Sequence, residues 1–167
     1  EAVAAAVDIP IMLYNVPGRT GTKIEPATVA KLSTVPNITS IKEACGSVDQ
    51  VTQIISLCGI TVLSGDDSLT LPMMSVGATG VVSVAANIVP AEVAALCREA
   101  AAGNYAGARE LHYKLAPLFK GLFIETNPMP VKAALARMGL IENYLRLPLV
   151  PLSEGKYAEL DAILKGL

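Results

Sequence analysis

The sequence predicts an α/β fold built from parallel strands, and two observations lead to this prediction. Short, almost entirely apolar runs recur along the first half of the chain, and longer runs with helical periodicity separate them. Strands that are apolar on both faces are typical of parallel βαβ units, because helices cover the sheet on both sides. The expected strands are residues 11–16, 39–44, 60–64 and 81–84.

Helices are expected between these strands. The first covers residues 22–35, with Pro26 in its first turn and Pro36 ending it. Ser47 is a natural N-cap for the second, and Gly59 stands where the glycine after its C-terminus would lie.

The remaining segments of this half are also predicted. Residues 68–76 form a third, short helix, and residues 17–21 form a loop after the first strand. Residues 1–7 resemble the tail of a helix already under way, so we expect a segment before Glu1.

Beyond residue 90 the pattern is helical only. Helices are expected at residues 92–102, 105–123, 128–140 and 153–167, with Asn127 capping the third and Pro128 at its first position. We therefore predict two parts, a βα region over residues 1–100 and a helical C-terminal region over residues 101–167.

Composition limits the function classes. The 52% apolar content is enough for a real core, and the formal charge of -2 gives no basic surface for nucleic acid. Cys45, Cys58 and Cys97 are odd in number and lack CxxC spacing, and the chain has one histidine. This argues against a disulfide framework and against a metal site, and favours buried thiols in a reducing cytoplasm.

Residues 68–91 carry no charge and are long enough to span a bilayer. Pro72, Gly77, Gly80 and Pro90 interrupt the run, and residues 80–84 have strand chemistry. The segment is therefore expected to be a helix, a turn, a buried strand and a loop, and no membrane contact is expected.

A candidate active site follows from the ends of two strands. Lys42 lies near the C-terminal end of one, Tyr14 near the end of the other, and Arg19 in the turn after Tyr14. In a parallel sheet these side chains converge on one edge, a suitable place for a small anionic carbonyl compound. Taken alone, each has a structural explanation: an ion-paired lysine, a strand-end tyrosine and a solvated arginine. Glu43 points to the opposite face and cannot pair with Lys42.

Other polar residues have simpler explanations. Asp66 and Asp67 precede a helix, so capping is favoured over metal binding. His112 lies in a predicted helix and is expected at the surface.

Five further motifs are informative in their order and spacing: YNVPGRTG at 14–21, IKEA at 41–44, LSGDD at 63–67, GVVSV at 80–84 and ETNPMPVK at 125–132. Together they resemble the second half of the dihydrodipicolinate synthase family of pyruvate-dependent lyases and synthases. The resemblance implies an eight-stranded (β/α) TIM barrel followed by a helical region, of which this chain holds the second half, about four βα units.

The resemblance also implies a reaction without a cofactor. Lys42 is similar to the lysine that forms a Schiff base with pyruvate, and Tyr14 to the tyrosine that relays protons. The resulting enamine would attack L-aspartate 4-semialdehyde, in the diaminopimelate route to lysine. Arg19 matches the arginine that binds the second substrate's carboxylate, and Gly65 and Val82 match positions lining the pyruvate pocket.

The resemblance is incomplete. The family's paired threonines, the tyrosine from a neighbouring subunit and the lysine-inhibitor residues match nothing in this sequence. The family also implies a homotetramer of tight dimers in the cytoplasm. Two alternatives stay open: another pyruvate-dependent aldolase such as an N-acetylneuraminate lyase, and a non-catalytic half-barrel that binds a partner.

Overall fold

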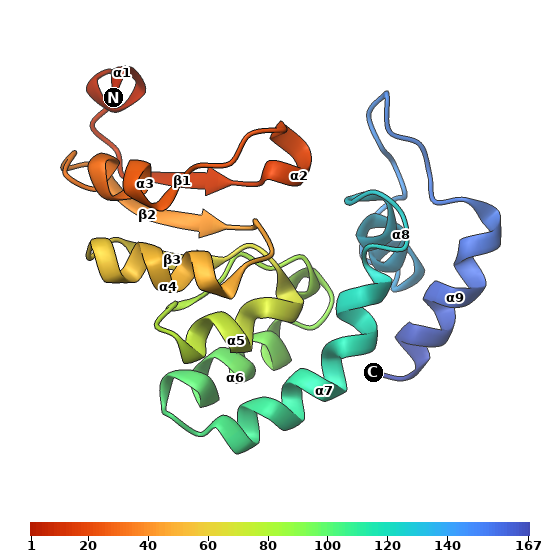
Figure 1. Ribbon diagram of the computed structural model, residues 1–167. Helices are drawn as coiled ribbons and strands as arrows, with labels where there is room; N and C mark the ends of the chain where they lie inside the picture. The colour runs from red at the N-terminus through yellow and green to blue at the C-terminus, as the bar shows by residue number, and fades with distance from the viewer. The chain divides into compact units, whose positions relative to one another are not determined.

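The computed structural model describes residues 1–167 and divides into two compact units, Glu1–Val82 and Ser83–Leu167. The first unit contains four strands, which are β1 (Ile11–Asn15), β2 (Ile38–Glu43), β3 (Thr61–Ser64) and β4 (Gly80–Val81). They form one parallel sheet in the order β1-β2-β3-β4, which confirms the predicted α/β fold (Figure 1).

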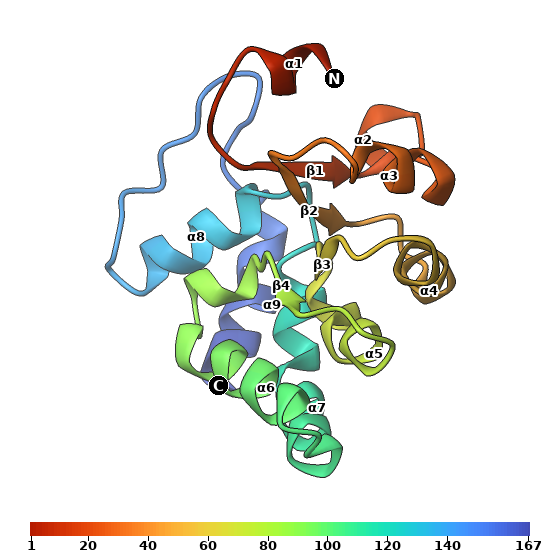
Figure 2. The ribbon, with the colours of Figure 1, turned by 90° about the vertical axis from the view of Figure 1, so that its left-hand side faces the viewer.

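Helices lie between the strands of this unit. They are α1 (Ala2–Ala5), α2 (Pro17–Thr20), α3 (Pro26–Leu32), α4 (Val48–Leu57), the 3-10 helix η1 (Asp67–Leu69) and α5 (Thr70–Ser75). Figure 2 shows α3, α4 and α5 side by side along one face of the sheet. The core between them includes Ile41, Val51, Ile54 and Val62, each buried.

The pairing of β1 with β2 contains an irregularity that determines which residues lie opposite each other at the strand ends. Ile11 pairs with Ile38, but Met12 pairs with Ser40, so Thr39 has no partner in β1. This extra residue is a bulge. Its consequence is that Tyr14 pairs with Lys42 and Asn15 with Glu43, one residue further along β2 than an unbroken ladder would give.

The sheet has two chemically different faces. Leu13, Ile41 and Val62 point toward the helices, while Met12 and Tyr14 point away and are 42% and 49% exposed. The face opposite the helices is therefore largely open within this unit.

The second unit is helical apart from its connections. It contains η2 (Ala85–Asn87), α6 (Pro90–Ala101), α7 (Tyr105–Gly121), α8 (Met129–Arg137) and α9 (Glu154–Lys165). Helix α6 packs on α7, and α9 packs on α7 and α8. Gly121 has no side chain where Ile163 of α9 approaches, which allows α7 and α9 to lie close together.

Three boundary predictions in the first unit are wrong. Residues 17–20 form helix α2, because Pro17 starts the turn and Gly21, at φ 70°, ends it. The helix predicted from residue 22 begins only at Pro26. The fourth strand ends at Val81, because β3 offers no partner beyond Ser64 and Ser83 instead accepts a hydrogen bond from the Ala86 N–H at 2.8 Å.

Other local predictions have mixed outcomes. Ser47 caps α4 as predicted, accepting from the Gln50 N–H at 3.2 Å. Gly59 follows the C-cap but does not adopt the left-handed conformation. Asn127 does not cap α8; Pro128 is the N-cap residue, and the buried Asn127 Oδ1 has no hydrogen-bond partner.

Two further predictions concern the burial of the cysteines and the fold of the uncharged segment 68–91. None of the three cysteines forms a disulfide, and all three are half-buried, not buried as predicted. The uncharged stretch folds as α5, β4 and η2, and no helix of the structure has the length and hydropathy that crossing a membrane requires.

Candidate active site

The ends of β1 and β2 bring Tyr14 and Lys42 together. The two residues are register partners in a parallel pair, so their side chains leave the same face at the same level. The Lys42 Nζ atom lies 4.2 Å from the centre of the Tyr14 ring, which is a cation–π contact. A phenol and a primary amine therefore share the open face of the sheet at its carboxyl edge, where parallel sheets place their chemistry.

Gly65 makes room for this pair. It follows β3, and its N–H donates to the Glu43 carbonyl at 2.7 Å. A Cβ atom at this position would lie 2.5 Å from the Ala44 Cβ and 3.1 Å from the Lys42 Cε. The absence of a side chain therefore lets the backbone pass close to the stem of Lys42.

Val82 lies one residue beyond β4. Its N–H donates to the Ser64 carbonyl at 2.8 Å, so the polypeptide after β4 stays beside the end of β3. Leu63 is the register partner of both Lys42 and Gly80, which aligns this edge with the lysine.

Arg19 lies on α2, directly after β1. It is exposed, and its guanidinium makes no ion pair within the chain. It makes no contact with Tyr14 or Lys42 of the kind that joins those two. Arg19 is thus a cation without an ion-pair partner, located after the carboxyl end of β1, where it can bind an anionic group.

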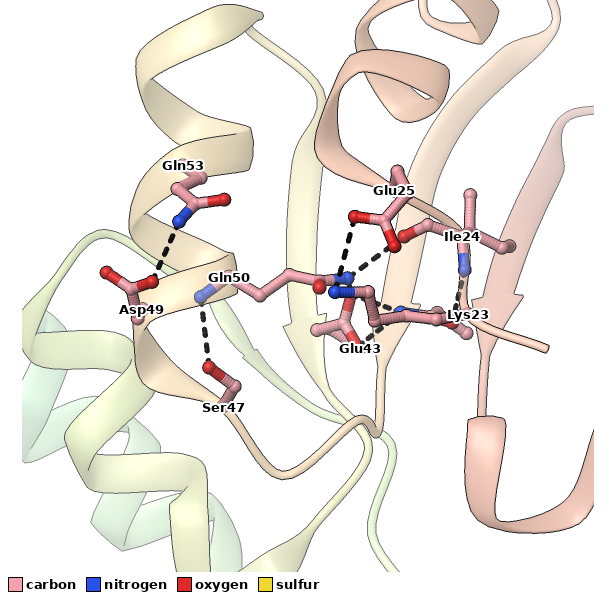
Figure 3. A network of polar contacts seen from close by, with 9 residues as sticks. Lys23, Ile24, Glu25, Glu43, Ser47, Asp49, Gln50 and Gln53 are labelled. Atoms are coloured by element: carbon pink, nitrogen blue, oxygen red, sulfur yellow. Dashed lines mark hydrogen bonds and ion pairs between the residues drawn. The ribbon is translucent and has the colours of Figure 1, made fainter. Parts of the chain in front are cut away.

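Glu43 is the polar residue that sequence reasoning did not assign to the site. It points away from Lys42, as predicted, and lies on the helix-covered face, where it is fully buried at 0% exposure. Its carboxylate accepts hydrogen bonds from Asn15, Cys45 and Gln50. Figure 3 shows Gln50 extending from α4 to the Glu43 carboxylate. The sequence shows only that Asn15 and Glu43 each directly follow a predicted site residue, which indicates neither that Glu43 is buried nor which residues donate to it.

The carboxylate alters its neighbour Cys45. Burial raises the pKa of the Cys45 thiol to about 11, and the hydrogen bond and negative charge of Glu43 act in the same direction. This thiol is therefore kept protonated at neutral pH, where it is a poor nucleophile.

Asp66 takes the N-cap position of η1, but its side chain makes no capping hydrogen bond, so the predicted capping is only positional. Burial raises the pKa of the Asp66 carboxyl, Asp67 and Glu43 raise it further, and Lys42 lowers it.

The chain is similar to known proteins along its whole length. The sequence profile described as "Dihydrodipicolinate synthetase family" matches residues 1–167. A 4-hydroxy-tetrahydrodipicolinate synthase of Citrifermentans bemidjiense is 53% identical over 167 residues, covering 99% of this chain and 58% of that protein.

Two solved structures are similar throughout. A dihydrodipicolinate synthase of Acinetobacter baumannii, chloride-inhibited and complexed with pyruvate, has a TM-score of 0.96 and 44% identity, over 99% of this chain and 57% of its own. A monomeric dihydrodipicolinate synthase variant has a TM-score of 0.95 and 44% identity, over the same shares. This chain therefore spans between half and two thirds of the length of these relatives.

Replacing Gly65 with alanine is expected to destabilise the protein by about 1–3 kcal/mol, because the new methyl group overlaps the Ala44 Cβ, which the backbone fixes. Urea unfolding measures the change. Gly59→Ala is the matched control: a Cβ there meets nothing within 4 Å and φ is not left-handed, so stability should be unchanged or rise by up to about 1 kcal/mol. Equal effects of the two changes would contradict the close approach at Gly65.

Cys45 is expected to react slowly with iodoacetamide at pH 8, with a rate that rises until the pH passes about 11. Peptide mapping by mass spectrometry gives the rate for this cysteine. In urea the thiol is exposed to water and no longer lies beside Glu43, so its pKa falls and its reaction at pH 8 should become faster. The pKa of this thiol is about 11 in the folded protein and 9.0 in the unfolded chain, so the folded state holds the proton more tightly. The stability that the protonated thiol contributes is therefore lost as the pH rises from 9.0 through about 11. Rapid alkylation of the folded protein at pH 8 would refute the environment described.

Proposed function

The chain belongs to the dihydrodipicolinate synthetase family, and on this premise we propose that the protein carrying it is a 4-hydroxy-tetrahydrodipicolinate synthase. The proposed enzyme is a lyase of the class I aldolase type that condenses pyruvate with L-aspartate 4-semialdehyde, in the diaminopimelate route to lysine. The observation that carries the proposal is the pairing of Lys42 with Tyr14 at the carboxyl edge of the sheet.

Lys42 is proposed as the nucleophile. Its neutral amine adds to the ketone carbon of pyruvate, and the resulting carbinolamine loses water to form an imine. Loss of a methyl proton from the imine gives an enamine, whose carbon attacks the aldehyde. The imine and enamine steps need only an amine and groups that transfer protons, so the proposal includes no metal or organic cofactor.

Tyr14 is proposed as the proton relay. Its hydroxyl both donates and accepts, so it can protonate the departing hydroxyl of the carbinolamine and later pass the proton on. The register partnership with Lys42 supports this role, since the phenol ring lies 4.2 Å from the amine.

The remaining site residues are proposed to bind the substrates. The unpaired guanidinium of Arg19 suits the carboxylate of the aldehyde substrate. Gly65 leaves space beside the Lys42 stem for the pyruvate adduct, and Val82 offers its main-chain carbonyl next to the end of β3.

Other polypeptide is proposed to complete this site. Met12 and Tyr14 are 42% and 49% exposed on the face that the helices leave open, and β1 and β4 are both edge strands. We propose that further strands cover this face as the rest of a (β/α) barrel. The whole assembly is proposed to be a cytoplasmic homotetramer, with residues 1–100 in the barrel and residues 101–167 in the helical region.

Treatment with pyruvate and borohydride should attach a reduced pyruvate group to Lys42, because borohydride reduces the imine to a stable amine. Peptide mapping by mass spectrometry locates the adduct, and Lys42→Arg, which keeps the charge, should lack it. The intact mass is measured first. If the mass corresponds to these 167 residues alone, the chain is co-expressed with the N-terminal part of the Citrifermentans bemidjiense relative, which precedes the matched region and supplies the rest of the barrel. An adduct elsewhere, or none in the completed protein, would refute the proposed nucleophile.

Arg19→Ala is expected to lower kcat/KM for aspartate semialdehyde about 10- to 100-fold, the value of a lost charge-assisted hydrogen bond. Imine formation with pyruvate, measured by borohydride trapping, should change far less. Arg109→Ala, at another exposed arginine without an ion pair, is the matched control and should leave both unchanged. Equal losses in both reactions would remove the proposed role of Arg19 and favour a different aldehyde.

A further inference from the structure

Glu43 is a buried carboxylate without a cation. It is 0% exposed, and none of the ion pairs of the chain includes it. Burying a charge in this way is costly unless hydrogen bonds replace the lost water. The structure supplies them: Asn15 Nδ2 donates to both oxygens at 2.9 and 3.0 Å, the Cys45 N–H donates at 2.9 Å and Gln50 Nε2 donates at 3.1 Å.

These bonds also fix both ends of the segment that carries Arg19. The side chain of Asn15, at the end of β1, accepts from the Ile24 N–H at 3.0 Å through its Oδ1. Gln50, in the first turn of α4, donates to the Ile24 carbonyl at 3.0 Å (Figure 3). Residues 16–23, including α2, are therefore held between Asn15 and Ile24, and both of these are connected to Glu43.

The same carboxylate lies directly behind the reactive pair. Asn15 and Glu43 are register partners, and each is the next residue after Tyr14 and Lys42, which are also register partners. Side chains alternate along a strand, so one pair faces the helices and the other faces the open side. A rotation or shift of the Asn15–Glu43 pair would therefore be transmitted through one peptide unit on each strand to Tyr14 and Lys42.

We propose that Glu43 is a positioning residue that holds Tyr14, Lys42 and the Arg19 segment in their reactive arrangement. This inference rests on the proposed function, because it takes those three residues as the groups that bind and convert the substrates. Glu43 itself faces away from the substrates and acts only through Asn15, Gln50 and the backbone.

The decisive change is Glu43→Gln, which keeps the shape of the side chain. Both carboxylate oxygens accept hydrogen bonds, so the amide group of glutamine must turn an N–H toward at least one donor in either orientation. The variant therefore breaks the network without emptying the site. Glu25→Gln is the matched control, since the Glu25 carboxylate is 60% exposed and pairs only with Lys23.

Kinetics must separate positioning from loss of folded protein. The fraction of chains trapped by saturating pyruvate and borohydride counts the sites that still form the imine. Per trapped chain, Glu43→Gln is expected to lower kcat/KM about 10- to 100-fold, as misplacement by about 1 Å does. KM for the aldehyde should rise more than KM for pyruvate, because Asn15 and Gln50, whose side chains hold Ile24 at the end of the Arg19 segment, lose bonds to residue 43. Glu25→Gln should match the unchanged protein.

The outcomes are distinguishable. If the unchanged protein forms no Lys42 adduct, the proposed function is wrong, and the positioning role falls with it. If the unchanged protein forms the adduct but Glu43→Gln has the same kcat and KM per trapped chain, only the positioning role is refuted. A lower trapped fraction with normal kinetics means that Glu43 serves stability alone, which also refutes it.

A second variant decides the matter if Glu43→Gln does not fold. Gln50→Met removes the donors to Ile24 and to one Glu43 oxygen but keeps the Asn15–Glu43 bonds. It is expected to raise KM for the aldehyde about 2- to 30-fold, with imine formation unchanged. An unchanged KM for the aldehyde would overturn the proposal.

Discussion

The pairing register between β1 and β2 is the constraint on which the site depends. Because side chains alternate along a strand, a slip of one residue would turn Lys42 toward the helices and Glu43 toward the open face. The bulge at Thr39 brings Lys42, and not Ile41, opposite Tyr14. Two interactions hold this register: the burial of Ile41 under the helices, and the hydrogen bonds between Asn15 and Glu43.

The apolar and polar contributions to this register have different effects. Apolar burial favours any pairing that keeps Ile41 and Val62 covered, and it tolerates small displacements. The Asn15–Glu43 bonds depend on distance and direction, so they restrict the strand ends much more narrowly. They lie at the carboxyl edge, where the reactive groups are, while the purely apolar contacts lie further back along the strands. The sheet is thus fixed most tightly where small displacements matter most to chemistry.

Much of this arrangement could be predicted from the sequence, for identifiable reasons. Strands β1 and β3 could be predicted because short apolar runs end at a proline or glycine, and β2 because β-branched residues lie between Asn37 and Gly46. Helix α4 could be predicted because Ser47 and its apolar periodicity are both visible locally. Helix α2 was missed because a four-residue helix has almost no periodicity, although Pro17 and Gly21 mark its ends. The end of β4 depends on where β3 stops, which is information from another part of the chain.

The Glu43 network could not be predicted for a related reason. Its donors come from residue 15, residue 45 and residue 50, and no spacing rule relates a strand-end asparagine to a glutamate 28 positions later. The alternation of side chains along β2 correctly predicts that Glu43 faces away from Lys42. It does not predict a function for Glu43, because a solvent-exposed glutamate would alternate in the same way. Burial distinguishes the two possibilities, and burial is a property of the folded unit.

The choice of a carboxylate at this position has a chemical reason. Asn15, Cys45 and Gln50 all present N–H groups to one small volume, so an apolar residue there would leave several buried donors unsatisfied. Glutamine could accept on one atom only, and aspartate is one methylene shorter. A glutamate carboxylate has two accepting oxygens and the required length. A network of this kind stabilises less than its number of bonds suggests, because the charge must first leave water. The network instead fixes the relative positions of three segments. Its donors come from β1, from α4 and from the residues after β2, and all of them are hydrogen-bonded in only one arrangement of these segments.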